Sequence, residues 1–262
     1  MMPSTLHIFG IDFPLYYCGF LLAFPACTLF NALYYRKCYP VGNIKLVLLT
    51  MFGINMVYIF LLVFPYFTFG KYFHGFNWIR VIGFVPLLWG LLALISKTKV
   101  SVFLDFMVPT TGIANIFVHT GCIFGGCCYG FPITDYPQWL QWMGIYNNAT
   151  QSYLFPIQLV ENAIILVLIV FMVLWARSKR FKTGGRAFPL YMVLFCVTRF
   201  FCEYLRDNEK IVANLSEFSF WCILWTIEGV VWLIVLHKRA NKPQEIPQEP
   251  DDLPLETAEA AA

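Results

Sequence analysis

The sequence predicts an all-α, polytopic membrane protein with seven transmembrane helices, an N-terminus outside the cytoplasm and a cytoplasmic C-terminus. Of its 262 residues, 59% are hydrophobic and only 13% are charged, and the mean hydropathy is +0.66. A soluble domain has roughly 25% charged residues. Apolar runs of about 20 residues, the length needed to cross about 30 Å of hydrocarbon, recur along the chain. Lysine and arginine gather in alternate connections between these runs.

Seven apolar segments have the required length. They lie at 14–35, 43–67, 77–96, 102–124, 155–176, 187–205 and 217–236. No basic region precedes the first segment, and it runs into YYRK rather than a cleavage site of small residues. We therefore expect a retained helix there and not a signal peptide.

The basic residues predict the orientation of these helices. Most of the 18 lysines and arginines flank the connections after the first, third, fifth and last segments: Arg36, Lys37, Lys45, Lys97, Lys99, Arg177, Lys179, Arg180, Lys182, Arg186, Lys238, Arg239 and Lys242. Cytoplasmic connections carry such an excess, so these turns are expected in the cytoplasm. The net charge of +3 then reflects topology and indicates no nucleic-acid partner.

We expect one membrane domain over residues 1–240 and a disordered, acidic cytoplasmic tail over 241–262. The tail is rich in proline and acidic residues and has no apolar periodicity, so it cannot bury enough surface to fold. The connection at 125–154 differs from the others because it is long and contains no lysine or arginine. Its aromatic rings favour the lipid headgroup region, which predicts an extracytoplasmic arm.

Polar residues are rare inside the apolar segments. Burying an ionisable side chain in a membrane costs free energy, so the few that occur there usually serve a function. Glu228 lies deep in the seventh segment and is assigned no role. The others lie in the outer parts of the fourth, fifth and sixth segments: His119, Gln158, Glu161, Arg199, Glu203 and Arg206. Three helices are thus expected to bring them to one depth in the membrane. Phospholipid headgroups lie at this depth, and guanidinium groups match phosphate oxygens. The pattern favours a phospholipid substrate, and the alternative is a buried ion pair that only fixes packing.

The spacing within the sixth segment adds a geometric expectation. Arg199, Glu203 and Arg206 stand at i, i+4 and i+7, which places them on one face of a continuous helix. Glu203 would then pair with one arginine and leave the other for an anion.

The stretch HTGCIFGGCCYG, residues 119–130, ends the fourth segment with several glycines. We expect Gly121, Gly125, Gly126 and Gly130 to allow a sharp turn close to a ligand, with backbone N–H groups free for an anion.

Three cysteines share that stretch, namely Cys122, Cys127 and Cys128. Their spacing lacks the C-x2-C pairs of structural zinc sites, so we expect no metal and favour a packing role. Two alternatives stay open. Cys122 can bridge Cys127 or Cys128 in an oxidising compartment, and a cysteine can act as a nucleophile with His119 as its base.

Three blocks of the chain resemble the phosphatidylglycerol prolipoprotein diacylglyceryl transferase family. They are DFMVPTTGIANIFVHTGCIFGGCCYG at 105–130, FPIQLVE at 155–161 and RFFCEYLR at 199–206, the last being the most specific. The resemblance extends from about Phe9 to Leu236. Members of this family are multi-pass enzymes of the bacterial inner membrane, with seven spans and an active site at the outer leaflet.

The resemblance implies transfer of a diacylglyceryl group from phosphatidylglycerol to the lipobox cysteine of a preprolipoprotein, without a cofactor. It implies catalytic roles for some of the polar residues, namely His119, Arg199 and Glu203. It implies substrate binding by others: Arg206, Gln158, Glu161, Gly121, Gly126 and Gly130.

The chain departs from the family pattern at several positions. His119 stands where the signature block has an arginine, Cys122 where it has an asparagine, and Cys127 where it has an acidic residue. The third segment lacks the family's histidine and paired glycines, and the first-segment tyrosine falls on Cys18. Two hypotheses follow. One is a divergent active transferase in which His119 assists thiol deprotonation, and the other is a catalytically silent protein that binds or moves a lipid.

Overall fold

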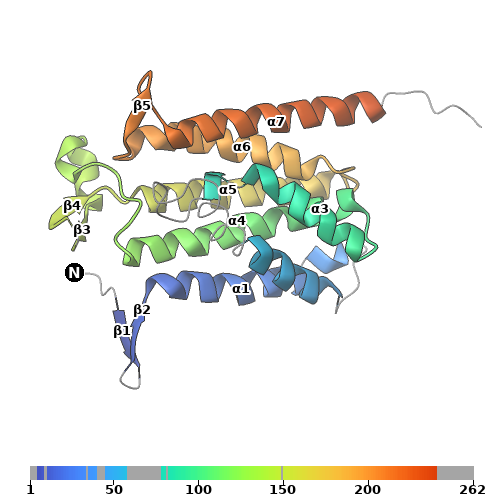
Figure 1. Cartoon of the computed structure of the whole chain (residues 1–262), viewed down its shortest axis with the longest axis horizontal. Helices are drawn as coiled ribbons and strands as arrows, with labels where there is room; N and C mark the ends of the chain where they lie inside the picture. Colours follow the sequence, from blue (N-terminus) through green and yellow to red (C-terminus); the bar gives the residue numbers. More distant parts are fainter. Residues whose placement is uncertain are drawn as a thin grey trace, which may run out of the picture.

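The computed structural model describes residues 5–8, 11–33, 35–39, 45–57, 78–80, 82–148 and 150–240. Its helices are α1 (Tyr16–Leu33), Lys45–Val57, α3 (Val85–Ile95), α4 (Val100–Phe124), α5 (Ile157–Ser178), α6 (Ala187–Cys202) and α7 (Glu217–Ala240) (Figure 1). Short 3-10 turns occupy Tyr35–Lys37, Trp78–Arg80, Ile82–Phe84, Ile133–Asp135, Gln138–Met143 and Glu203–Leu205. The predicted all-α class is confirmed for the long elements.

Strands occur only in three short antiparallel hairpins within these described ranges. The pairs are β1 (Thr5–Ile8) with β2 (Ile11–Pro14), β3 (Ile145–Asn147) with β4 (Ser152–Leu154), and β5 (Lys210–Val212) with β6 (Leu215–Ser216). All three hairpins gather at one end of the long helices (Figure 1). That end therefore carries most of the non-helical structure.

Four helices are long and apolar enough to cross a membrane: Val100–Phe124, Ile157–Ser178, Ala187–Leu205 and Glu217–Ala240. They coincide with the predicted fourth to seventh segments. Shorter apolar helices, Leu21–Leu33, Lys45–Val57 and Val85–Ile95, fall within the first three. The rest of the second predicted segment and the start of the third lie outside the described residues.

The third predicted segment is not one long helix. Two 3-10 turns precede α3, and Pro86 lies in the first turn of that helix. Proline fits a first turn because its missing N–H would have no partner there. At 11 residues α3 spans only about 16 Å at 1.5 Å per residue, half the thickness of the hydrocarbon layer.

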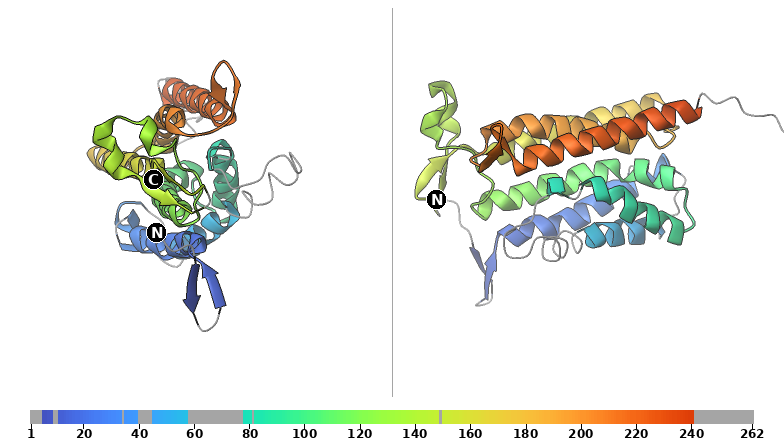
Figure 2. Two further views of the ribbon diagram at one scale, coloured as in Figure 1. Left: turned by 90° about the vertical axis from the view of Figure 1, so that its left-hand side faces the viewer. Right: turned by 45° about the horizontal axis from the view of Figure 1, so that its top comes forward.

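Helix α4 lies at the centre and packs against α1, α3, α5 and α6 (Figure 2). Small residues allow the close approach that membrane helices use. A Cβ atom on Gly19 of α1 would lie 2.4 Å from the Phe117 carbonyl oxygen. Polar contacts add to this packing, because the Asn31 amide donates to Thr110 Oγ1 at 2.6 Å and to Thr50 Oγ1 at 3.2 Å. Three helices are thereby joined inside the apolar layer.

Asp105 of α4 caps the N-terminus of α6. Its carboxylate is 1% exposed and accepts hydrogen bonds from the backbone N–H groups of Gly185 at 2.8 Å, Ala187 at 2.9 Å and Phe188 at 3.3 Å, and from the Thr183 hydroxyl. An anion at this end satisfies N–H groups that lack helical partners and complements the helix dipole. The aspartate that opens the signature block thus has a structural role.

The outward faces of the helices carry large exposed apolar side chains. On α5 they are Leu159, Leu166, Val167, Val170, Phe171 and Leu174, and α7 carries a similar set. A water-soluble protein rarely exposes such continuous apolar surface, whereas hydrocarbon solvates it. The chain is therefore an integral membrane protein.

The predicted arm at 125–154 consists of two 3-10 turns and the β3–β4 hairpin, at the end of the helices where β5 and β6 also lie (Figure 1). Trp139 and Trp142 are 71% and 80% exposed. The Tyr136 hydroxyl donates to the Leu205 carbonyl at 2.8 Å and so ties the arm to the end of α6. The predicted tail at 241–262 lies outside the described residues.

Candidate active site

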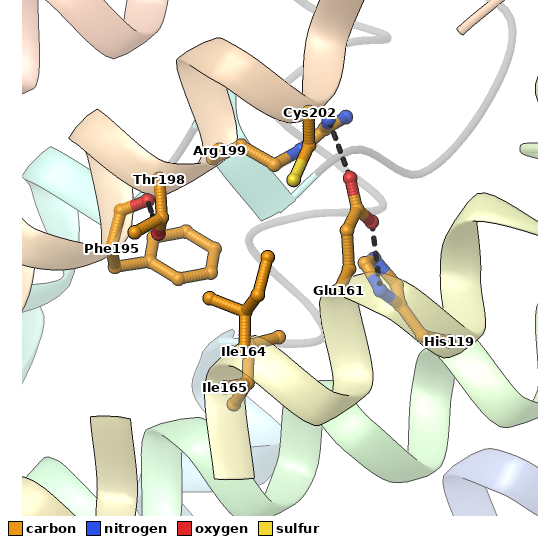
Figure 3. Close-up of a pocket in the computed structure, with 8 residues that line it drawn as sticks. All are labelled: His119, Glu161, Ile164, Ile165, Phe195, Thr198, Arg199 and Cys202. Carbon is orange, nitrogen blue, oxygen red and sulfur yellow. Dashed lines mark hydrogen bonds and ion pairs between the residues drawn. The ribbon is translucent and has the colours of Figure 1, made fainter. Parts of the chain in front are cut away.

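A buried cluster of charged residues joins α4, α5 and the end of α6. It contains His119 of α4, Glu161 of α5, and Arg199, Glu203 and Arg206, and the last four are each at most 6% exposed. The predicted convergence of three helices at one depth is confirmed. Figure 3 shows His119 and Arg199 on either side of Glu161.

Glu161 is the centre of the cluster. Its Oε1 accepts from Arg199 Nη1 at 2.7 Å and from Arg206 Nε at 3.2 Å. Its Oε2 accepts from Arg206 Nη2 and lies 3.2 Å from His119 Nδ1. One carboxylate therefore orients two guanidinium groups and an imidazole.

Glu203 holds the second side of the cluster. Its Oε2 lies 2.9 Å from Arg199 Nη1, while its Oε1 accepts from Ser216 Oγ at 2.9 Å and from the Asn208 amide. Asn208 and Ser216 were not predicted from the sequence. They are small polar residues in the connection before α7, and nothing in their spacing indicates that they reach Glu203.

The expected single helical face for Arg199, Glu203 and Arg206 is wrong. Helix α6 ends at Cys202, Glu203–Leu205 form a 3-10 turn, and Arg206 is extended with φ −101° and ψ 144°. Arg206 leaves the helix because its backbone pairs with Gly130 of the arm in a β-bridge. Its side chain then turns toward Glu161 on the neighbouring helix.

The expectation that one arginine is free for an anion is also wrong, because both are paired with Glu161. Burial disfavours the charged form of Arg206, but the adjacent Glu161 carboxylate raises the pKa of its guanidinium, which stays charged. Two carboxylates balance two guanidinium groups. The cluster is therefore electrically neutral when His119 is neutral.

Gln158 connects the cluster to the glycine-cysteine turn. It is fully buried, and its Nε2 donates to the Cys127 carbonyl at 2.6 Å. Its Oε1 has no hydrogen-bond partner among the described residues. The amide thus fixes the turn from the side of α5.

The predicted free N–H groups of the glycines are not observed. Gly126 N–H donates to the Ile123 carbonyl at 3.3 Å and Gly130 N–H to the Phe155 carbonyl at 2.9 Å. Gly121 lies inside α4, where its Cα would be 3.0 Å from a Cβ on Gly19. These glycines serve close backbone packing, and Gly126 also adopts a positive φ of 69° that favours glycine.

Gly130→Ala is expected to loosen the arm and lower the melting temperature. A Cβ there would lie 2.5 Å from the Leu205 carbonyl oxygen and 2.8 Å from the Tyr136 hydroxyl, so the bridge to Arg206 would have to shift. Such overpacking typically costs about 1–3 kcal/mol. Thermal unfolding in detergent measures it, with Gly90→Ala as the matched control, because a Cβ at Gly90 meets only Val100 at 3.6 Å. Equal melting of the two variants would contradict the role given to Gly130.

A small pocket, with room for about one water molecule, opens beside the cluster among α4, α5 and α6. His119, Glu161 and Arg199 line its polar side, and its other walls are Ile164, Ile165, Phe195, Thr198 and Cys202 (Figure 3). The pocket thus places an apolar surface next to charged groups.

Fold and site together define a multi-helix membrane protein with a buried charged cluster beside an apolar wall, at one end of its helices. The family model for prolipoprotein diacylglyceryl transferase matches residues 15–235. The chain belongs to this family.

Curated relatives carry the same name. A phosphatidylglycerol–prolipoprotein diacylglyceryl transferase of Clostridium tetani is 33% identical over 128 residues, 48% of this chain and 50% of the relative. Transferase 2 of Clostridium perfringens is 28% identical, covering 59% of each chain. Transferase 1 of Streptomyces coelicolor is 29% identical, covering 56% of this chain and 43% of the relative. The chain thus spans about half the length of the curated relatives it matches.

Proposed function

We propose that this protein transfers the diacylglyceryl group of phosphatidylglycerol to the lipobox cysteine thiol of a preprolipoprotein. The observation that carries the proposal is the buried cluster of His119, Glu161, Arg199 and Arg206 beside the pocket. Glu161 takes only some of the N–H groups of each guanidinium, so the remaining N–H groups of Arg199 and Arg206 can donate to a lipid phosphate while the apolar wall faces the acyl chains. The names of the matched relatives support the same reaction.

The proposed reaction is a displacement at the glyceryl carbon that bears the phosphate. The acceptor thiolate forms a C–S bond at this carbon, and the C–O bond to phosphate breaks. Glycerol phosphate leaves with the electron pair, and the thiol proton passes to a base. Arg199 and Arg206 stabilise the negative charge that develops on the leaving phosphate, as preorganised donors do in other transfer reactions.

His119 is the proposed base. Its Nδ1 lies 3.2 Å from Glu161 Oε2, so a protonated imidazole would have a carboxylate partner. Proton transfer from the thiol turns a neutral cluster into a positive one while charge develops on the leaving group. In this proposal His119 supplies, during the reaction, a charge that an arginine at this position would carry permanently.

The role of His119 predicts a pH dependence. With histidine as base, transfer falls as the pH is lowered through the His119 pKa, because the protonated ring cannot accept a proton. His119→Gln is expected to lower the transfer rate by about 10²- to 10⁴-fold, the usual contribution of a general base, and to leave lipid binding intact. Rates and lipid binding measured across pH 5–9 check this. His119→Arg is the companion variant, expected to tighten binding of the anionic headgroup. An unchanged profile with full activity in His119→Gln would remove His119 from the mechanism.

We also propose the finer topology: seven spans in the bacterial inner membrane, the N-terminus and the 125–154 arm outside, and the basic turns inside. The exposed rings of Trp139 and Trp142 and the basic Arg177–Arg186 connection support this orientation. A Trp139→Cys variant is expected to gain labelling by a membrane-impermeant maleimide in intact cells, above the level of the parent protein. Lys179→Cys is the control, expected to label above the level of the parent protein only after permeabilisation. The reverse pattern would invert the topology.

A transfer assay tests the proposed function directly. Purified protein is mixed with phosphatidylglycerol and a lipobox peptide, and mass spectrometry detects a diacylglyceryl-modified cysteine. Vesicles of phosphatidylcholine and a peptide with serine in place of cysteine are the controls. Lipid binding without any modified peptide would favour the silent lipid-binding alternative.

A further inference from the structure

Three cysteines gather beside the charged cluster. Cys122 lies in the last turn of α4 and is buried, whereas Cys127 and Cys128 follow in the turn and are exposed. The three Sγ atoms all lie within 4.8 Å of one another. The proposed transfer reaction assigns no role to these three thiols.

The backbone of the turn brings the sulfur atoms together despite their spacing in the sequence. Gly126 and Cys128 have positive φ angles of 69° and 65°, so the chain folds back over the end of α4. The Cys127 N–H donates to the Cys122 carbonyl at 3.1 Å, which closes the turn. A side chain at this φ is strained, and Cys128 adopts it nonetheless.

Two amides from other elements hold this turn in place. Asn147 of β3 donates to the Gly126 carbonyl at 2.9 Å, and Gln158 of α5 donates to the Cys127 carbonyl at 2.6 Å. The cysteines therefore lie on a backbone that is fixed from two sides. Such fixed backbones suit metal sites, because the ligands need little reorganisation to bind.

The group offers three sulfur donors, one from each cysteine. Thiolates are the ligands that soft cations prefer.

We propose that Cys122, Cys127 and Cys128 form a binding site for one soft d10 cation, Zn²⁺ or Cu⁺, held by three thiolate sulfurs. A metal–sulfur distance of about 2.3 Å separates the sulfurs by roughly 3.8–4.0 Å in tetrahedral or trigonal geometry. That separation fits within the observed 4.8 Å limit. Binding releases the thiol protons of the three cysteines to solvent, and water can supply a fourth ligand at the exposed side.

This site replaces the packing role expected from the sequence. The C-x4-C-C spacing lacks the usual zinc pairs, but the two positive φ angles supply the curvature that those pairs normally provide. A bound ion would hold the turn in place between α4 and Gly130. The Cys127 carbonyl of this turn accepts a hydrogen bond from Gln158. The proposal does not depend on whether the protein transfers a lipid.

Metal titration of the full-length protein tests the proposal. The reduced, chelator-treated protein in detergent is titrated anaerobically with Zn²⁺ and, separately, with Cu⁺ against a competing chelator. One equivalent is expected to bind, with release of protons and a thiolate-to-metal absorption band in the Cu⁺ complex. Cys127→Ser and Cys128→Ser should each weaken the affinity for the metal by more than about 100-fold. Changes to residues that only hydrogen-bond to a metal ligand weaken the affinity by at most about 100-fold.

Cys38→Ser is the matched control, because Cys38 directly follows the turn Tyr35–Lys37, and α1 before this turn runs away from the end of the helices that carries the hairpins (Figure 1). It should bind the ion as the parent protein does. Both test positions are exposed, so their serine variants should fold, and elution in detergent checks this. Retention of the ion in both variants would overturn the proposal, as would a reduced parent protein that binds neither ion.

Discussion

Arg206→Ala is expected to abolish transfer of the diacylglyceryl group. The Arg206 guanidinium contacts both oxygens of Glu161 and is 4% exposed, so it is the most enclosed cation of the cluster. Removing it leaves the cluster negative beside the place proposed for a lipid phosphate. Loss of one oxyanion-stabilising donor costs about 10²- to 10³-fold in rate, and loss of a permanent charge should cost at least as much.

Conservative and control variants sharpen this result. Arg206→Lys should keep a small part of the activity, because an ammonium group cannot reproduce the two-pronged contact of a guanidinium. Arg177→Ala removes an exposed arginine from the far end of α5 and should retain full activity. Equal rates for the parent protein and Arg206→Ala would refute the placement of Arg206 in the site.

Glu161→Ala is expected to cause the largest loss of stability. It leaves the two buried guanidinium groups of Arg199 and Arg206 without their shared carboxylate. Removing one partner of a buried ion pair typically costs about 3–5 kcal/mol. Part of the Arg199 charge stays compensated by Glu203, 2.9 Å away, so Arg206 bears most of the effect.

Thermal unfolding in a mild detergent measures this prediction. Glu209→Ala is the control, since Glu209 is exposed in the connection after Arg206, and surface substitutions stay within about 0.5 kcal/mol. A double variant, Glu161→Ala with Arg206→Ala, should recover part of the lost stability because it removes an uncompensated charge. If Glu161→Ala melted with the parent protein, the cluster would not be the buried network described above.

The convergence of polar residues was predictable from the sequence, because ionisable side chains inside apolar segments usually face the interior of the helix bundle and pair with one another. His119, Glu161 and Arg199 lie at matching depths in three segments, and the structure brings them into contact. The exact pairing was not predictable. Arg206 leaves the helix through its bridge to Gly130, a contact between positions far apart in the chain, and helical spacing does not indicate it.

The same limit applies to the cysteines and to the fold. Spacing alone did not indicate the sulfur cluster, because it depends on positive φ angles at Gly126 and Cys128. Hydropathy located the fourth to seventh segments, because an apolar run of that length is expected to form a membrane-spanning helix. In the third segment the apolar run extends on both sides of Val85, and composition does not reveal that the α-helix starts only at that residue.

The protein is proposed to be an active diacylglyceryl transferase, although His119 stands in place of the family arginine. Complementation of a bacterial strain depleted of its own transferase tests this activity, with expression confirmed by immunoblot. The parent protein is expected to restore growth and lipoprotein modification, whereas Arg206→Ala at equal abundance is not. Failure of the correctly inserted parent protein to restore lipoprotein modification would show that the protein is not an active transferase.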